Sequence, residues 1–178
     1  MAKSKVSIGL CNPKSPDNVN SVRRAAGNYR VSSIFYTGSR YPRALSLNPG
    51  APNINRDVSL NIPVIGVDNL IEQVADDCQV VCVEFAQGAT PLTEFTHTDN
   101  ALYIFGPEDG TISQKVIDRA DSVVYIPTVG CMNLAASVNV VLYDRLSKSS
   151  INYASEELIS NSRDTNNNLK VKVSTDTN

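Results

Sequence analysis

The chain has 178 residues, of which 42% are hydrophobic, a formal net charge of −2 and no Trp. This length suits one well-buried domain and is short for two. No apolar run approaches the roughly 20 residues that span a bilayer, and the N-terminus lacks the apolar core of a signal peptide. We therefore expect a cytoplasmic protein without a membrane span.

The net charge hides a segregated charge distribution. Residues 1–56 carry nine Lys and Arg against Asp17 alone, a sum of +8, so the rest of the chain sums to −10. Between Arg56 and Lys115 there is no Lys or Arg, whereas ten acids lie there. A basic third of this kind is the footprint of a polyanion-binding face. The alternative is that the basic N-terminal third and the acidic remainder of the chain simply offset each other's charge on a solvated surface.

Short β-branched runs alternate with helix-patterned segments through the chain. In chain order the patterns predict strands at 6–10, 33–36, 64–67, 80–84, 101–105 and 123–126, and helices at 18–28, 68–76, 113–120 and 133–146. This alternation is typical of an α/β fold with a mostly parallel sheet and helices on both faces. In such sheets, ligands bind beyond the carboxyl ends of the strands.

Two segments fall outside this pattern. Residues 37–61, rich in Gly, Pro and Asn, form a predicted loop that is too long to be only a connection. From residue 149 onward the chain is rich in Ser, Asn and Thr, which predicts disorder. We therefore expect one domain over residues 1–148 and a polar, disordered tail over 149–178.

The last predicted helix is apolar nearly all round. From Leu134 to Tyr143 only Ser137 and Asn139 interrupt the apolar residues. A helix with this pattern is normally buried on more than one side. A second chain, or an unusual wrapping of the same chain, is therefore expected to cover it.

Few residues suggest metal or nucleotide chemistry. Cys11, Cys78, Cys82 and Cys131 form no Cys-x-x-Cys pair, so we expect free thiols and no metal site. The only histidine, His97, lies in a polar stretch and is predicted to be a surface residue without a partner. The absence of a Gly-x-x-x-x-Gly-Lys-Ser/Thr loop and of a Gly-x-Gly-x-x-Gly turn argues against nucleotide hydrolysis and a nicotinamide cofactor.

Three segments that follow predicted strands carry polar residues. In the first, Asp17 or Asn18 can cap a helix on which Arg24 points about half a turn away from the core stripe, toward solvent, RNA or a partner. The predicted core stripe is Val19, Val22, Ala26 and Tyr29. The second segment is a Gly106-x-Glu108 turn. The third is Ile126-Pro127 followed by Cys131-Met-Asn-Leu-Ala135.

The order and spacing of these segments resemble the three motifs of the SpoU/TrmH branch of the SPOUT RNA methyltransferases, over about residues 5–148. The matching residues are Asn18 and Arg24, Gly106 and Glu108, Ile126 and Pro127, and Met132 to Leu134. The resemblance implies a C-terminal trefoil knot that binds S-adenosylmethionine, a homodimer formed through the knot and last helix, and methylation of RNA ribose 2′-hydroxyls. The substrate would be tRNA or rRNA, with tRNA preferred because small family members often act on the anticodon loop.

The resemblance also implies roles for single residues. Arg24 would be the catalytic arginine, which stabilises alkoxide character rather than acting as a base. Asn18 would shape its pocket, and Glu108 and Asn133 would hold the loops around it; Cys131 completes the catalytic candidates. The implied cofactor contacts are Glu84, Phe85, Gly106, Ile126, Met132 and Leu134. The expected RNA contacts are Lys14, Arg23, Arg40 and Arg43.

Several residues depart from the family pattern. Positions where Gly is usual hold Asn20, Arg30 and Thr111, and positions where Ser is usual hold Cys131 and Ala135. A thiol is a weaker hydrogen-bond donor than a hydroxyl. These departures leave open a non-catalytic RNA-binding or scaffolding protein on the same fold. Methylation of a substrate other than RNA is a further alternative, but it would leave the basic third unexplained.

Overall fold

The computed structural model describes residues 5–47, 61–150 and 154–171. The chain divides into two units, Met1–Lys148 and Ser149–Asn178. In the second unit, helix α6 (Glu156–Ser162) follows Ser155, whose hydroxyl accepts a hydrogen bond from Leu158 N at 3.0 Å. This capped helix lies within the tail for which the sequence predicts disorder, and the division into a domain and a disordered tail stays a prediction.

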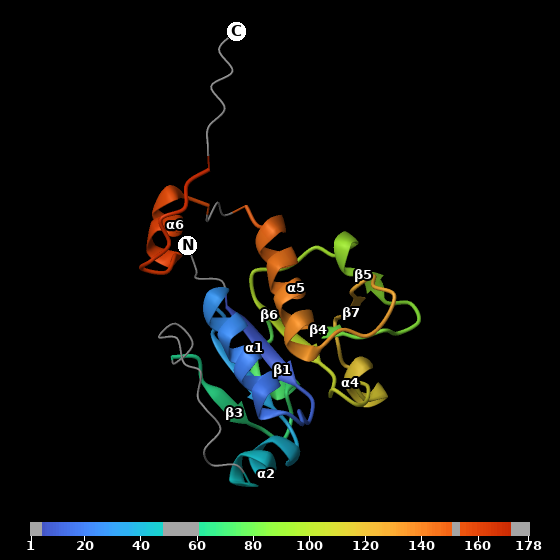
Figure 1. Ribbon diagram of the computed structural model, residues 1–178. Helices are drawn as coiled ribbons and strands as arrows, with labels where there is room; N and C mark the ends of the chain where they lie inside the picture. Colours follow the sequence, from blue (N-terminus) through green and yellow to red (C-terminus); the bar gives the residue numbers. More distant parts are fainter. Residues whose placement is uncertain (1–4, 48–60, 151–153, 172–178) are drawn as a thin grey trace. The chain divides into compact units, whose positions relative to one another are not determined.

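Within the described residues, seven strands form one sheet in the order β3-β2-β1-β6-β4-β7-β5, and each neighbouring pair is parallel (Figure 1). The strands are β1 (Val6–Leu10), β2 (Ser33–Tyr36), β3 (Val64–Gly66), β4 (Gln79–Val83), β5 (Thr90–Pro91), β6 (Ala101–Phe105) and β7 (Ser122–Tyr125). The α/β prediction is confirmed, and six strands lie within one residue of their predicted bounds. Of the seven described strands, the two-residue strand β5 was the one that the sequence did not predict. The knot stays a prediction.

The central strands β1 and β6 are buried over their whole length. Along β6, Tyr103 and Phe105 belong to one core, and Leu102 and Ile104 belong to the other. Successive side chains of a strand point to opposite faces, so a central parallel strand needs apolar residues at every position. This requirement explains the continuous run Ala-Leu-Tyr-Ile-Phe.

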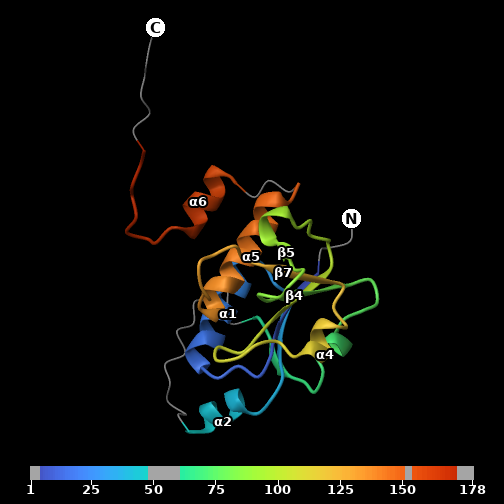
Figure 2. The same cartoon turned by 90° about the vertical axis from the view of Figure 1, so that its right-hand side faces the viewer.

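Helices cover the two faces unequally. Helices α1 (Pro16–Asn28) and α5 (Leu134–Lys148) pack against each other on one face, whereas the short helix α4 (Gln114–Ile117) lies on the other (Figure 2). Leu70 also packs on the α4 face. A Cβ at Gly9 would lie 3.2 Å from a Leu70 methyl carbon, so the glycine leaves room for that close contact. In the described part of the chain, no helix is long and apolar enough to cross a membrane.

Several helix predictions were wrong. The predicted helix 68–76 is only the 3₁₀ turn η1 (Ile71–Gln73). The side-chain oxygen of Asn69 accepts from Ile71 N at 3.1 Å, and the backbone carbonyl of Asn69 accepts from the side-chain amide of Gln73. Such local bonds compete with a helix that is too short to be stable alone. The predicted helix 113–120 is reduced to α4.

The predicted loop 37–61 is partly helical. It contains α2 (Arg40–Leu47), which buries Tyr41 edge-on against Tyr36. Residues 48–60 of this segment lie outside the described residues. Another short 3₁₀ turn, η2 (Leu92–Glu94), was not predicted.

Helix α5 buries one side against the core and exposes the other. Its buried residues are Leu134, Ala135, Val138, Val141 and Leu142. On the opposite side Asn139 is exposed, and Tyr143 is 63% exposed. The described residues of this chain therefore leave part of this apolar helix uncovered, and the cover expected from a second chain or from an unusual wrapping of the same chain stays a prediction.

His97 is not the unpartnered surface residue that the sequence predicted. Its side chain is 4% exposed, with Nδ1 2.6 Å from the Tyr103 hydroxyl and Nε2 2.8 Å from Asp144 Oδ2. Lys148 Nζ lies 2.8 Å from the same carboxylate oxygen, and Arg145 donates to the Tyr103 hydroxyl at 3.2 Å. This network ties the last turns of α5 to β6.

We expect acid to weaken this network. Burial lowers the pKa of His97, Asp144 opposes that shift, and Arg145 and Lys148 reinforce it. Because the folded pKa lies below the unfolded value of about 6.5, stability is present above that pH and is lost as the pH falls below it. Urea unfolding between about pH 7.5 and 5.5 should show this loss. The His97→Gln variant, which contains no histidine, should show a nearly flat profile. Retention of the slope in the variant would contradict the assignment.

Candidate functional site

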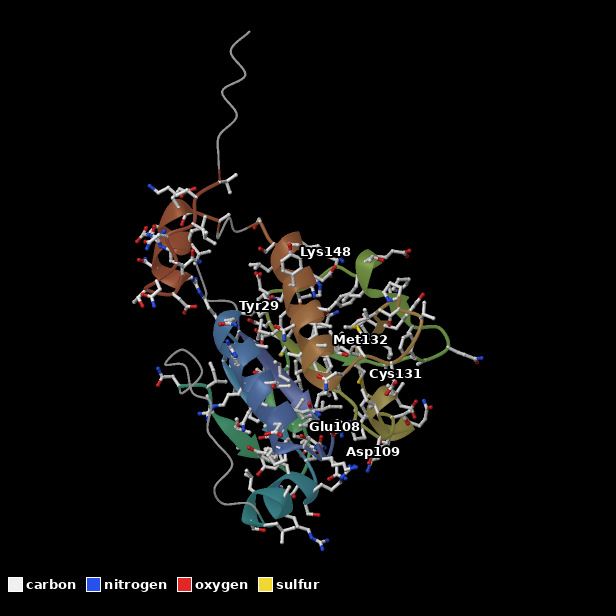
Figure 3. The ribbon with its side chains drawn as sticks, viewed as in Figure 1. Tyr29, Glu108, Asp109, Cys131, Met132 and Lys148 are labelled. Atoms are coloured by element: carbon white, nitrogen blue, oxygen red, sulfur yellow. The ribbon has the colours of Figure 1, made fainter. Side chains whose placement is uncertain are left out.

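A cleft of ≈ 140 Å³ opens at the carboxyl ends of the neighbouring strands β6, β4 and β7. Its walls come from the segments that follow these strands. All six predicted cofactor residues line it: Glu84, Phe85, Gly106, Ile126, Met132 and Leu134. Glu108 and Cys131 line it as well, and Figure 3 shows Cys131 and Met132 on the segment before α5. Residues that are up to 50 positions apart in the sequence thus meet at one edge of the sheet.

The Glu108 carboxylate joins the loops beside this cleft. Its Oε2 accepts from Lys14 N at 2.9 Å, and its Oε1 accepts from Ser15 N and from Asn18 Nδ2, both at 3.0 Å. Asn18 Oδ1 in turn accepts from Asn133 Nδ2 at 3.0 Å. Three of the predicted catalytic residues therefore form one hydrogen-bonded chain.

These hydrogen bonds hold Glu108 in its ionised form. Burial alone would raise the pKa of Glu108, but the hydrogen bonds from the Asn18 side chain and from the Lys14 and Ser15 amides outweigh burial and lower it. A carboxylate whose acceptor sites face protein donors is a poor general base. The geometry therefore suits Glu108 to positioning the loops rather than to taking a proton.

Asn133 also caps helix α5. Its Oδ1 accepts from Ala135 N at 2.9 Å and from Ala136 N at 3.3 Å, which satisfies two of the backbone donors that every helix leaves open at its start. The same side chain thus starts α5 and contacts Asn18 on α1. The position of α5 relative to the cleft depends on this residue.

Glu84 binds the opposite wall of the cleft. Its carboxylate accepts from Phe85 N at 3.0 Å and from Ile112 N at 2.9 Å, so it attaches the loop after β6 to the end of β4. A Cβ at Gly106 would lie 3.2 Å from Glu84 Oε2 and 3.3 Å from Ile112 N. Glycine at this position lets the carboxylate approach the backbone closely.

The structure does not bring Arg24 into the cleft. Arg24 is exposed on α1, while Val19, Val22 and Ala26 are buried, so its predicted position on the helix wheel is confirmed. Among the described residues its guanidinium has no hydrogen bond or ion pair, and it is not part of the cleft lining. Within one chain, Arg24 is therefore apart from Asn18, Glu108 and Asn133.

The four predicted RNA contacts differ in their surroundings. Arg40 makes a bidentate ion pair with Asp109, and Lys14 Nζ lies 3.6 Å from the same carboxylate. Arg23 Nε donates to the Ile62 carbonyl at 3.0 Å, and Arg43 is exposed on α2. Sequence reasoning missed Asp109, although it follows Glu108 directly.

Sequence reasoning also missed the residue that caps α1. Ser15, rather than Asp17 or Asn18, precedes the helix, and its hydroxyl accepts from Asn18 N at 3.3 Å. The signal was present, because Ser followed by Pro at the first helical position marks a helix start. This cap leaves the Asn18 side chain available to Glu108.

The positions that depart from the family pattern lie in different environments. Arg30 has φ 58°, a left-handed conformation that glycine adopts more easily. Ala135 is buried in the core, whereas Cys131 and Thr111 are exposed and Asn20 is half-buried. Only Cys131 of these residues lines the cleft.

All four cysteines are free thiols, as predicted. Burial, with a smaller effect of nearby Glu84, raises the pKa of Cys11 to about 11. Burial likewise raises the pKa of Cys82 to about 12. Both thiols therefore stay protonated at neutral pH, which makes them poor nucleophiles and ligands. The described residues contain no cluster of three or more Cys, His, Asp or Glu side chains that could hold a metal ion.

Comparison with known proteins agrees with this architecture. A model of the SpoU rRNA Methylase family matches residues 5–143. A search of curated protein sequences finds no match. Many solved structures share the fold, and three of them are compared with this chain below.

The first is a TrmH/SpoU tRNA modifying enzyme from A. aeolicus, with 18% identity and a TM-score of 0.65 over 89% of this chain and 85% of that one. The second, from work on the 2-OH methylation of C/U34 on tRNA, has 20% identity and a TM-score of 0.68 over 83% and 92%. The third is an AdoMet-bound rRNA methyltransferase from Sinorhizobium meliloti, with 18% identity and a TM-score of 0.65 over 82% and 57%. At these identities the likeness establishes a shared fold.

The cap of α5 can be tested by substituting Asn133. The Asn133→Ala variant should lower the free energy of unfolding by about 0.5–2 kcal/mol, because it leaves the amides of Ala135 and Ala136 without an acceptor. The Asn133→Asp variant keeps the acceptor oxygens and should retain most of the stability, although it loses the donor to Asn18. Urea unfolding measures both. Equal losses in the two variants would show that the cap is not the origin of the effect.

Proposed function

This chain belongs to the SpoU rRNA Methylase family, and from that premise we propose that it is an S-adenosylmethionine-dependent RNA 2′-O-ribose methyltransferase that acts on tRNA. The observation that carries the proposal is the hydrogen-bonded chain Glu108–Asn18–Asn133 beside the cleft. It joins residues from all three motif segments at the edge of the sheet where ligands of parallel sheets bind.

The donors and surfaces of the cleft fit S-adenosylmethionine. Apolar side chains such as Phe85, Ile126 and Leu134 offer a slot for an adenine ring, and the carboxylates of Glu84 and Glu108 favour a cation nearby. Backbone groups of the segment before α5 can hold the ribose. When bound, this cofactor supplies an electrophilic methyl group. The chain's own residues then hold the RNA hydroxyl in line with that methyl group and stabilise its loss of a proton.

We assign Arg24 to the RNA hydroxyl and its neighbouring phosphate. A guanidinium, which stays protonated in proteins, is a poor base, but it stabilises a developing alkoxide and binds phosphate. Its exposure and lack of a partner on the described part of the chain agree with a group that waits for substrate. Glu108, Asn18 and Asn133 position the loops, and Cys131 lines the same cleft.

We further propose a homodimer formed through α5 and the knot expected of the family. Asn139 and Tyr143 lie on the uncovered side of α5, and α1, which carries Arg24, packs beside α5. A partner that covers this side would place its own Arg24 near the cleft. Each active site would then be composite.

The tRNA preference rests on the fold shared with proteins that modify tRNA, among them the one that concerns 2-OH methylation of C/U34. Lys14, Arg23, Arg40 and Arg43 would contact phosphates, with an affinity that falls as the salt concentration rises. Such a substrate is compatible with a cytoplasmic location. A non-catalytic RNA-binding or scaffolding protein on the same fold is the alternative that the test below separates.

Titration with S-adenosylmethionine by calorimetry tests the proposal directly. We expect saturable binding, because the six cleft residues predicted for the cofactor lie together. Mapping of ribose 2′-O-methylation in RNA from a strain that lacks the gene should then reveal one lost modification in tRNA. If no heat of binding is measured at millimolar cofactor, the enzyme proposal fails and the scaffolding alternative is favoured.

The composite site predicts complementation between two inactive variants. Arg24→Ala and Asn133→Ala homodimers should each transfer little methyl to tRNA. A heterodimer of one Arg24→Ala subunit and one Asn133→Ala subunit combines one intact cleft with the intact Arg24 of the other subunit, so it should recover about half of the wild-type activity per dimer. Purified heterodimers are assayed with labelled cofactor and tRNA. Activity no higher than that of the homodimers would rule out sharing.

A further inference from the structure

The carboxylate of Asp109 lies between two of the predicted RNA-binding cations. Arg40 Nη1 donates to Oδ1 at 2.8 Å, Arg40 Nη2 donates to Oδ2 at 2.9 Å, and Lys14 Nζ is 3.6 Å from Oδ2. The three residues follow the neighbouring strands β6, β2 and β1. The cluster therefore lies at the same edge of the sheet as the cleft, and Figure 3 labels Asp109 next to Glu108 there.

This arrangement has the geometry of a phosphate site. The two parallel N–H groups of a guanidinium bind a carboxylate and a phosphate in the same two-point manner. Arg40 is also held in place, since its backbone amide donates to Asn12 Oδ1 at 3.4 Å and Asn12 N donates to the Thr37 hydroxyl at 3.3 Å. In the structure, the Asp109 carboxylate stands where a phosphate oxygen pair would bind.

The ion pair is open to water and can exchange partners. The side chains of Asp109, Arg40 and Lys14 are 50%, 31% and 64% exposed. Ion pairs with this exposure are weak, because water and salt compete with them. An RNA phosphate that offers the same two-point contact, and further contacts elsewhere, can therefore displace the carboxylate.

The neighbouring carboxylates of Glu108 and Asp109 differ in the kind of partner that they bind. Glu108 accepts from neutral donors, the amides of Lys14 and Ser15 and the side chain of Asn18. Asp109 instead pairs with cations, for which a phosphate competes directly. Glu108 and Gly110, on either side of Asp109, both line the cleft, so a displacement of Asp109 would reach one wall of that cleft.

We propose that Arg40 and Lys14 form a binding site for an RNA phosphodiester that Asp109 occupies while RNA is absent. Asp109 is thus an internal competitor of the substrate and couples RNA binding to the loop between Glu108 and Gly110. This inference rests on the proposed function, because it takes RNA as the substrate.

Binding of labelled tRNA to the full chain tests this competition. Asp109→Asn should tighten binding by about three- to fivefold, because it frees Arg40 from an exposed ion pair. The matched control is Asp118→Asn, which removes the same charge from an exposed carboxylate that accepts from Gln114 and has no ion pair among the described residues. The control should change binding much less. Thermal unfolding and cofactor titration check that both variants fold, and Asp109→Ser serves as a second variant.

A double-mutant cycle assigns the gain to Arg40. Arg40→Gln alone should weaken tRNA binding, and Asp109→Asn should add no more than the control in that background. A gain for Asp109→Asn that equals that of Asp118→Asn, or that persists without Arg40, would overturn the inference while leaving the proposed function intact. A wild-type chain that binds no tRNA would overturn the proposed function itself.

Inorganic phosphate at matched ionic strength should compete only weakly with tRNA for this site. Competition as strong as that of RNA would assign the site to free phosphate and overturn the inference.

Discussion

The carboxylate of Glu108 holds together the loops on which the candidate site depends. It accepts two hydrogen bonds from the segment between β1 and α1 and one from Asn18 in the first turn of α1, and through Asn18 it reaches Asn133 at the start of α5. Loops of this kind have little apolar core of their own, so polar networks with satisfied partners must hold them. One ionised side chain thereby sets the relative positions of three segments that lie about 90 and 115 residues apart in the sequence.

This constraint also explains how the fold and the site share α5. The apolar side of the helix packs on the sheet beside α1, and its first residue follows the capping Asn133. The opposite side leaves Tyr143 exposed, and Arg24 is exposed on α1. In the homodimer that we propose, the second copy covers this side of α5 and brings its own Arg24 to the cleft.

The limits of sequence reasoning follow from the strength of each local signal. Strands such as β1 and β6 were predicted because a central parallel strand must be apolar at each position. The helix expected at 68–76 failed because the Asn69 side chain accepts from the Ile71 amide, a local hydrogen bond that competes with helical pairing. His97 was misplaced because its partners, Tyr103 and Asp144, are brought to it only by the packing of α5 on β6.

In the candidate site, too, some features follow from the local sequence and others depend on the tertiary structure. The sequence by itself determined the α/β class, the residue types at the ends of the strands and the apolar character of α5, because each depends on the order of neighbouring residues. Only the tertiary structure decided that Glu108 accepts from Asn18, that Asp109 pairs with Arg40, and that Arg24 lies apart from both. These relations depend on distances across neighbouring strands, which the pairing register and the packing of helices set and which no local pattern encodes.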